Sequence, residues 1–208
     1  MNRRLSFIAS VLCLLAPTVG RADAPVYVPV PAQSSLSFSG TQQGEKFTGT
    51  FRDYDAKISY AADQLATSHI DVTIRLKSLD SKNQERYSSL AGTDWFDFAK
   101  FPTATFRAAT IRSTPTGPVG DADLTIKGHT KRIAFPFTWK VDGAKATLDA
   151  RVTLDRIDFG LGTGEWADDA VAGKKVEVVV HLQLGAAAPA PAPAPAPAKP
   201  APAAAPKH

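Results

Sequence analysis

The sequence predicts an all-β fold, a closed antiparallel barrel of about eight strands with one short helix. Apolar and polar residues alternate in short, regularly spaced segments over residues 34–184, which is typical of strands with one buried face. The apolar phase slips once, between Phe51 and Tyr54, as at a β-bulge or sharp bend that lets a sheet curl and close. The only cysteine, Cys13, precedes this region, so no disulfide can join two sheets, and the barrel is favoured over a sandwich.

The clearest strand covers residues 68–76. Ile70, Val72, Ile74 and Leu76 share one face, whereas the residues between them are polar or charged. One dry face and one wet face indicate an antiparallel sheet with a single buried side. The same alternation predicts further strands that include residues 34–38, 47–60 (one long strand bent at the phase slip), 104–108, 124–126, 133–139, 148–154 and 176–184.

One helix is expected, over residues 84–91. Ser81 and Gln84 have the spacing of a capping box, and Gly92 can end the helix. An eight-stranded barrel with this helix either fills itself with side chains or holds one small ligand. Periodicity leaves both alternatives open.

Glycine and proline place the connections between the later strands. Residues 114–120 contain two prolines and two glycines and predict a turn. Asp142-Gly143 predicts a hairpin. Pro136 interrupts the strand over 133–139, which indicates an edge position or a bulge.

The first 24 residues are predicted to be a cleaved signal peptide. Arg3 and Arg4 precede an apolar run over residues 5–16 that is too short to span a bilayer. Ala22-Asp23-Ala24 has the small-x-small form of a cleavage site, so we predict cleavage after residue 24. The leader therefore predicts a secreted protein.

The composition of the mature chain excludes several function classes. Removal of the leader lowers the net charge from +4 to +2, because it contains Arg3, Arg4, Arg21 and Asp23. A nearly neutral domain gives no electrostatic support to nucleic-acid binding. The mature chain also has no thiol for a disulfide, a metal site or a nucleophile.

The chain then divides into one domain and one tail. Residues 25–184 are enough for a single core. Residues 185–208 are almost wholly alanine and proline, a composition that blocks helix and sheet and favours extended polyproline II. We predict a disordered, semi-stiff tail, and a spacer without a specific partner is the simplest interpretation.

The densest aromatic cluster lies in a connector over residues 95–102. Its rings fit neither strand alternation nor an amphipathic helix, and Pro102 favours a new strand directly afterwards. Two interpretations are open: the rings cap the core, or they line the mouth of a cavity for an apolar ligand. Trp95 and Phe96 are the candidates for ligand contact, whereas Phe98 and Phe101 are expected to pack.

A search for catalytic motifs finds none. The histidines at 69, 129, 181 and 208 lack metal-site spacing. The glycine-rich residues 160–164 follow a strand without opening a helix, so they do not predict a phosphate loop. The segment from Arg156 to Gly160, followed by Glu165-Trp166, is either an ion pair with a covering aromatic or a lid with a polar anchor for a head group. We predict no enzyme activity, no metal and no cofactor.

Several ordered motifs resemble the YceI-like family of periplasmic, polyisoprenoid-binding proteins. The resemblance covers about residues 32–184 and rests on Ala32-Gln33-Ser34 with Leu36 and Phe38, on Phe47 to Phe51, on Asp94 to Asp97 with Phe101, Pro102 and Phe106, on Asp123 to Arg132, and on Arg156 to Gly160. It implies a lipocalin-like, eight-stranded barrel with an apolar tunnel for an isoprenoid chain.

The resemblance also implies a function. We expect a non-catalytic carrier that binds an isoprenoid lipid or quinone. The side chains expected to line its tunnel are Phe38, Phe51, Ile74, Leu76, Trp95, Phe96, Phe106, Leu124, Phe135, Phe159 and Trp166. The residues expected near the ligand's head group are Gln33, where many relatives have His, Arg156 and Asp158.

Two other functions stay open at this point. The protein can be a structural or interaction module of the cell envelope that binds no lipid. It can also be an accessory protein of a periplasmic redox system, because the form of residues 162–166 resembles a branch found near cytochrome b561, itself a possible inner-membrane partner. A homodimer is left open.

Overall fold

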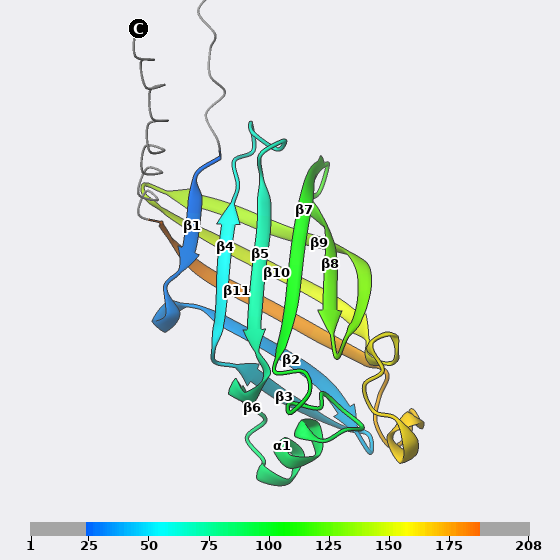
Figure 1. Ribbon diagram of the computed structural model, residues 1–208. Helices are drawn as coiled ribbons and strands as arrows, with labels where there is room; N and C mark the ends of the chain where they lie inside the picture. The colour runs from blue at the N-terminus through cyan, green and yellow to red at the C-terminus, as the bar shows by residue number, and fades with distance from the viewer. Residues whose placement is uncertain (1–23, 188–208) are drawn as a thin grey trace, which may run out of the picture.

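The structure is a computed structural model that describes residues 24–187, and it confirms a closed antiparallel β-barrel with one α-helix (Figure 1). The leader, residue 24 excepted, and the tail from residue 188 onward lie outside the described residues. The ring has eight strands, and the last pairs with the first: β1 (Val26–Pro29), β4 (Tyr54–Ser59), β5 (His69–Arg75), β7 (Thr103–Thr114), β8 (Gly117–Ile126), β9 (His129–Asp142), β10 (Lys145–Asp155) and β11 (Lys175–Ala186).

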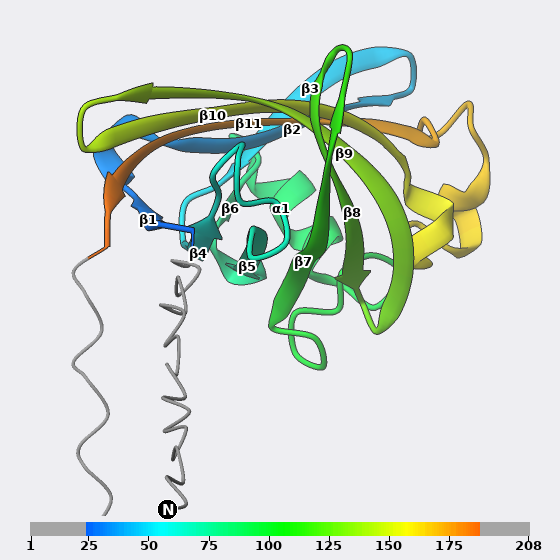
Figure 2. The ribbon, with the colours of Figure 1, turned by 90° about the horizontal axis from the view of Figure 1, so that it is seen from above.

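Three more strands extend the sheet beyond β11 and form a flap. β2 (Ser35–Gln42) pairs with β11, β3 (Glu45–Phe51) pairs with β2, and the short β6 (Leu79–Asp80) pairs with β3. In the described part of the chain the flap does not pair with β5. The barrel is therefore closed by β1 at one end and splayed at the other, as the view from above shows (Figure 2).

The phase slip predicted from the sequence separates two strands and is not a bulge within one. β3 ends at Phe51 and β4 begins at Tyr54. β3 belongs to the flap, whereas β4 pairs with β1 and β5 in the closed ring. The break at residues 52–53 thus assigns two adjacent segments to different parts of the sheet, the flap and the closed ring.

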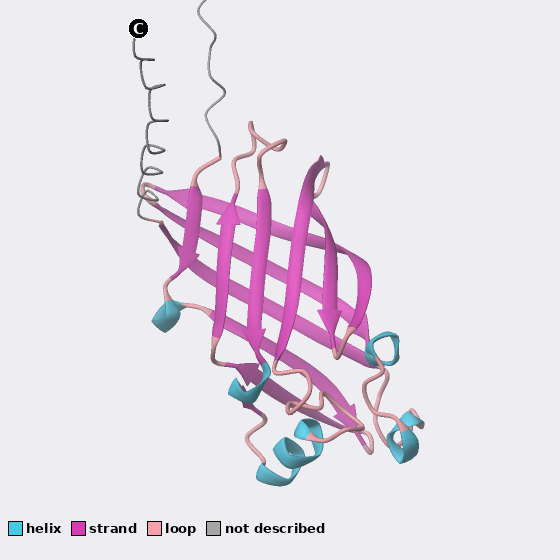
Figure 3. Cartoon of the chain, in the orientation of Figure 1, coloured by secondary structure: helices cyan, strands magenta, loops and turns pink. Residues whose placement is uncertain are grey.

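The helix α1 (Gln84–Ala91) has the predicted bounds and ends at Gly92. Its N-cap differs from the prediction: the Asn83 side chain, not that of Ser81, accepts the backbone N–H of Arg86 at 2.8 Å. α1 lies at the splayed end with three of the four 3₁₀ helices (Figure 3). The 3₁₀ helices are η1 (Pro31–Gln33), η2 (Leu76–Ser78), η3 (Arg156–Phe159) and η4 (Gly164–Ala167).

The predicted connections hold in part. The β9–β10 hairpin turns at Gly143, whose φ of +59° suits glycine. The predicted turn over 114–120 is shorter, because β8 already begins at Gly117. Pro136 is not on an edge strand: it is the last residue of β9 paired with β8, and pairing with β10 begins at Phe137. Its missing N–H therefore falls where β9 changes partner.

The ordered contacts of the domain reach slightly beyond both predicted boundaries, residues 25 and 184. Gly185 and Ala186, assigned to the tail, continue β11 and pair with β1. At the other terminus Ala24 is 3% exposed, and its carbonyl accepts a hydrogen bond from Ser59 Oγ at 2.9 Å. Cleavage after residue 24 would remove this contact from the mature protein.

Candidate functional site

A cavity of about 650 Å³ extends through the barrel from its closed half into the splayed half. Because side chains alternate across a strand, the apolar residues predicted to share one face of each strand point inward together. Ile70, Val72 and Ile74 of β5 line one wall, and Val178 and Val180 of β11 line another. The question that periodicity left open is thus answered: the described side chains do not fill the barrel.

Four aromatic rings close the cavity at the β1 end. Tyr27 and Tyr60 pack edge-on against Trp139, with ring centroids 5.2 and 5.1 Å apart, and Phe137 packs edge-on against Tyr60 at 5.3 Å. None of the four lines the cavity, and Ile58 beneath them is fully buried. Such edge-to-face packing favours a rigid, dry floor.

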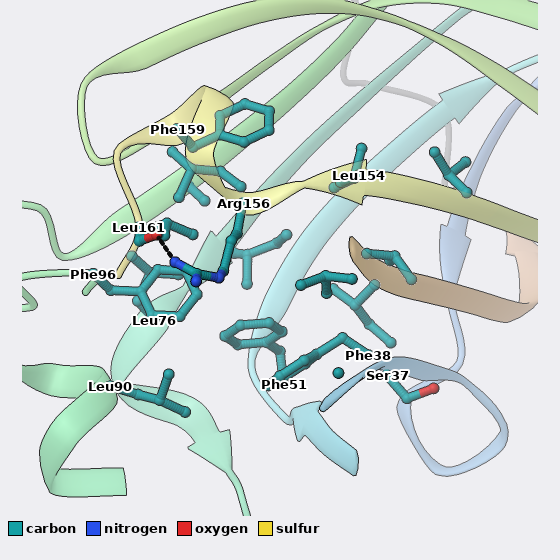
Figure 4. A pocket seen from close by; sticks show the side chains of 18 of the residues that line it. Ser37, Phe38, Phe51, Leu76, Leu90, Phe96, Leu154, Arg156, Phe159 and Leu161 are labelled. Carbon is teal, nitrogen blue, oxygen red and sulfur yellow. Dashed lines mark hydrogen bonds between the residues drawn. The ribbon is translucent and has the colours of Figure 1, made fainter. Parts of the chain in front are cut away.

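All of the side chains predicted to line a tunnel do line this cavity, and Figure 4 shows several of them around its splayed half. They come from strands on every side, from the connector and from the loop after β10. Contact with a ligand stays a prediction for each one. The residues are Phe38, Phe51, Ile74, Leu76, Trp95, Phe96, Phe106, Leu124, Phe135, Phe159 and Trp166.

The connector divides as predicted between cavity wall and packing. Trp95 and Phe96 line the cavity, whereas Phe98 is 4% exposed and packs against Tyr87 with ring centroids 5.9 Å apart. Phe101 lies outside the cavity, beside Gly128. The turns of the connector place the adjacent Trp95 and Phe96 on the wall of the same cavity, which strand alternation cannot do.

The predicted head-group residues separate in space. Gln33 lies on the exposed η1, and Asp158 is exposed and pairs with Lys131 at 3.5 Å. Neither lines the cavity, whereas Arg156 does. The ion pair considered between Arg156 and Asp158 is not formed. Of the three residues predicted to lie near the head group, only Arg156 therefore lines the cavity.

Arg156 is 2% exposed and organises the loop between β10 and β11. Its guanidinium has five N–H groups, and the structure provides five backbone carbonyl acceptors. The Nη1 atom donates to Leu161 and Gly162 at 2.6 and 2.9 Å, and Nε donates to Gly173 at 3.1 Å. The Nη2 atom donates to the carbonyls of Trp166 and Ala172. Arg156 thus ties both ends of this loop together.

The charge of Arg156 is held without a carboxylate in contact among the described residues. Burial lowers the pKa of the guanidinium from its usual value, and the charges of Asp155 and Asp169 oppose this effect. The guanidinium also lies over the Trp95 ring, 5.2 Å from its centroid. Trp95 in turn packs edge-on against Trp166, with centroids 5.8 Å apart. The loop and the connector therefore meet around one buried cation.

Sequence reasoning missed the polar residues at the splayed end. The β2–β3 hairpin contributes Gln42, Gln43 and Glu45, and the α1 region contributes Asn83, Glu85, Arg86 and Ser89. Several are exposed, so they mark where the cavity meets solvent. The sequence held one indication of this polar surface, because Arg86, Ser89 and Leu90 share a helix face. Only the tertiary structure shows that this face looks onto the cavity.

Two further searches over residues 24–187 were negative. No group of three histidine, cysteine or carboxylate side chains is placed to hold a metal ion. No described helix has both the length and the apolar character to cross a membrane.

Comparison with known proteins places the chain that forms this cavity in a family. The YceI-like domain family matches residues 27–184. A UPF0312 protein of Vibrio vulnificus is 31% identical over 180 residues, which are 79% of this chain and 94% of that protein. A UPF0312 protein of Pseudomonas fluorescens is 36% identical over 121 residues, or 54% of this chain, and the chain covers 62% of that relative's length.

Solved structures with the same fold agree. BcnA of Burkholderia cenocepacia is 29% identical, with a TM-score of 0.71 over 74% of this chain and 98% of that one. A polyisoprenoid-binding domain from Saccharophagus degradans is 16% identical, with a TM-score of 0.59 over 77% of this chain and 98% of that one. At this identity the second likeness shows the fold alone.

Proposed function

The chain belongs to the YceI-like domain family, and from this premise we propose that it is a non-catalytic carrier of a long-chain isoprenoid lipid. The observation that carries the proposal is the apolar cavity of about 650 Å³ inside a closed barrel. A structural neighbour is named as a polyisoprenoid-binding domain, which supports a lipid ligand. The same cavity weighs against a structural module that binds nothing.

The physical fit is direct. An isoprenoid chain is almost pure hydrocarbon, and burial of each CH₂ group contributes roughly 0.8 kcal/mol. The walls of the cavity are alternating aliphatic and aromatic side chains, and the floor is an aromatic cluster. A chain that enters from the splayed end can bury its length against these walls without leaving a polar group unpaired.

Catalysis has little support from the groups on the cavity wall. Arg156 is the only charged side chain that is buried among the described residues, and backbone carbonyls take its N–H groups. Arginine stays protonated and cannot act as a general base at neutral pH. The proposal therefore includes neither an enzymatic step nor a cofactor beyond the bound lipid.

We place the mature protein in the periplasm, since the leader has the form of a cleaved signal peptide. A quinone or a prenyl precursor is the expected ligand. A cytochrome b561-type partner stays a prediction from the family resemblance, and a homodimer stays open.

Lipid extraction from the native protein tests the central point. The full chain is purified from its own cell envelope and denatured, and the extract is examined by mass spectrometry. We expect a prenyl lipid in the wild-type protein. Val152→Trp on β10 places a large ring in the cavity and is expected to reduce the bound lipid at least tenfold.

Thr153→Trp is the matched control, because the neighbouring Thr153 is exposed and faces away from the cavity. It should retain the wild-type amount of lipid. Equal lipid in both variants, or wild-type protein without any lipid, would contradict the proposal.

A further inference from the structure

We propose that the ligand's head group lies at the splayed end against Arg86, and that this mouth accepts a neutral head group with oxygen acceptors. This inference rests on the proposed function and extends it by naming the head-group chemistry. A quinone carbonyl has the required chemistry, whereas a prenyl diphosphate does not.

The distribution of polar groups along the cavity determines the orientation of the ligand. The closed half is lined by residues such as Ile58, Leu148 and Leu182, which are at most 4% exposed. The polar lining residues gather at the other end, on the β2–β3 hairpin and the α1 region. A polar head group forced against the aromatic floor would lose its hydrogen bonds, so it is expected at the mouth.

Arg86 is the positive group at this mouth with donors to spare. Its Nε donates to Gln42 Oε1 at 3.3 Å, and its Nη1 donates to the Ser81 carbonyl at 3.4 Å. Two of the five guanidinium N–H groups are thus used. No other described residue accepts from the remaining three, and no described carboxylate lies within 4.0 Å.

The orientation of Arg86 is already set before a ligand arrives. Its guanidinium lies over the Phe47 ring, 4.5 Å from the centroid. The long bond to Gln42 holds it toward the hairpin, and the hairpin itself is bonded to the loop after β10, where Gln43 N–H donates to the Val171 carbonyl at 3.0 Å. A planar guanidinium held in this way is suited to an acceptor oxygen.

The other buried polar groups near the cavity are not available to a head group. All five N–H groups of Arg156 have backbone acceptors. Trp95 Nε1 has no acceptor among the described residues, but less than 1 Å² of this atom is accessible, so a ligand does not reach it. Arg86 is therefore the charged group at the cavity that can still donate hydrogen bonds to a head group.

The charges around the mouth select against an anionic head group. Glu45 and Glu85 line the same end of the cavity, and both are exposed. Arg86 and Arg156 also line the cavity, so its charged lining residues sum to zero, and the exposed ones among them are the two glutamates. A diphosphate meets these two like charges and one guanidinium with free N–H groups, whereas a neutral carbonyl meets that guanidinium without repulsion.

Binding of three matched probes to the full, delipidated protein tests the inference. The probes are a hexaprenyl benzoquinone, hexaprenyl diphosphate and squalene, a hydrocarbon of similar length. Intrinsic fluorescence reports binding, because Trp95 and Trp166 line the cavity. We expect the benzoquinone to bind most tightly. Arg86→Gln should lower the affinity for the benzoquinone about tenfold, since a hydrogen bond to a charged group is lost. The affinity for squalene should not change.

Arg107→Gln is the matched control. Arg107 is exposed on the outside of β7 and pairs with Asp71 at 3.4 Å, so all three affinities should stay at wild-type values. Gln42→Leu is a second variant that removes the amide beside Arg86. It should lower the affinity for the benzoquinone severalfold, and this test still holds if Arg86→Gln proves unstable in thermal unfolding.

The possible results separate this inference from the proposed function. If none of the probes binds wild-type protein, the proposed function fails. If the benzoquinone binds but Arg86→Gln and Gln42→Leu leave its affinity unchanged, or lower squalene affinity equally, the head-group site is overturned. Tighter binding of the diphosphate than of the benzoquinone overturns the preference for a neutral head group.

Discussion

The two ends of the barrel are built from the same kind of strand but are closed by different means. At one end β1 pairs with both β4 and β11, and an aromatic cluster seals the floor. At the other end β2, β3 and β6 leave the ring, and loops, α1 and the connector surround an opening. The closed end is held by apolar packing, whereas the splayed end combines a second apolar cluster with the contacts of Arg156 to backbone carbonyls.

Under the proposed function, this difference would let one barrel both hold a hydrocarbon chain and exchange it. Burial of aliphatic and aromatic groups makes the floor rigid and dry. At the mouth, the loop after β10 depends on the hydrogen bonds of Arg156. The polar and exposed lining residues of the cavity gather at this end, so ligand entry is expected here.

The largest effect is expected from removing the polar centre of the splayed end. Arg156→Met leaves five backbone carbonyls without their donor and should lower the free energy of unfolding by about 4 kcal/mol. Urea denaturation at neutral pH measures it. The control is Arg151→Met on β10, an exposed arginine paired with Glu177 at 2.6 Å, which should cost less than about 1 kcal/mol. Similar losses in both variants would contradict the central role of Arg156.

A somewhat smaller effect is expected at the closed end. Ile58 is fully buried next to the aromatic floor, and Ile58→Ala should cost about 3 kcal/mol, since it removes apolar contacts and enlarges the cavity. Lys57→Ala, its exposed neighbour on β4, should change the free energy of unfolding by no more than about 0.5 kcal/mol. If Ile58→Ala proves neutral, the floor is not the rigid part of the barrel.

The smallest effect is expected at the edge of the flap, where it depends on pH. The Lys82 backbone N–H and the Arg52 guanidinium, both bonded to Asp80, hold the pKa of this carboxyl below its usual value. Ionised Asp80 therefore stabilises the fold above the unfolded pKa of about 3.9, and this contribution is lost as the pH falls through the lower folded pKa.

Asp80→Asn removes that titration. The difference in stability between wild-type protein and the variant should be constant above about pH 5 and shrink below about pH 4. Urea denaturation at a series of pH values measures this difference. A difference that grows on acidification would show that Asp80 does not stabilise the flap.

The sequence by itself determined the inward faces of the strands. Alternation placed Ile74, Phe106 and Leu124 on the wall of the cavity, because side chains of a strand point to opposite faces with a period of two. The aromatic density around Trp95 marked the connector for a different reason, because large apolar rings in a loop are usually buried against other side chains. Gly92 marked the end of the helix, whereas the cap predicted at Ser81 was wrong, because Asn83 caps the helix.

Tertiary structure alone decided which end is open and which polar groups face the cavity. Gln33 and Asp158 lie outside it, whereas Arg86 lies at its mouth. Local pattern cannot separate these residues, because each sits in a short polar segment and its surroundings come from strands distant in sequence. The pairing of β1 with β11 closes one end, and the departure of the flap leaves the other open. Such long-range pairing has no counterpart in the alternation of a single strand.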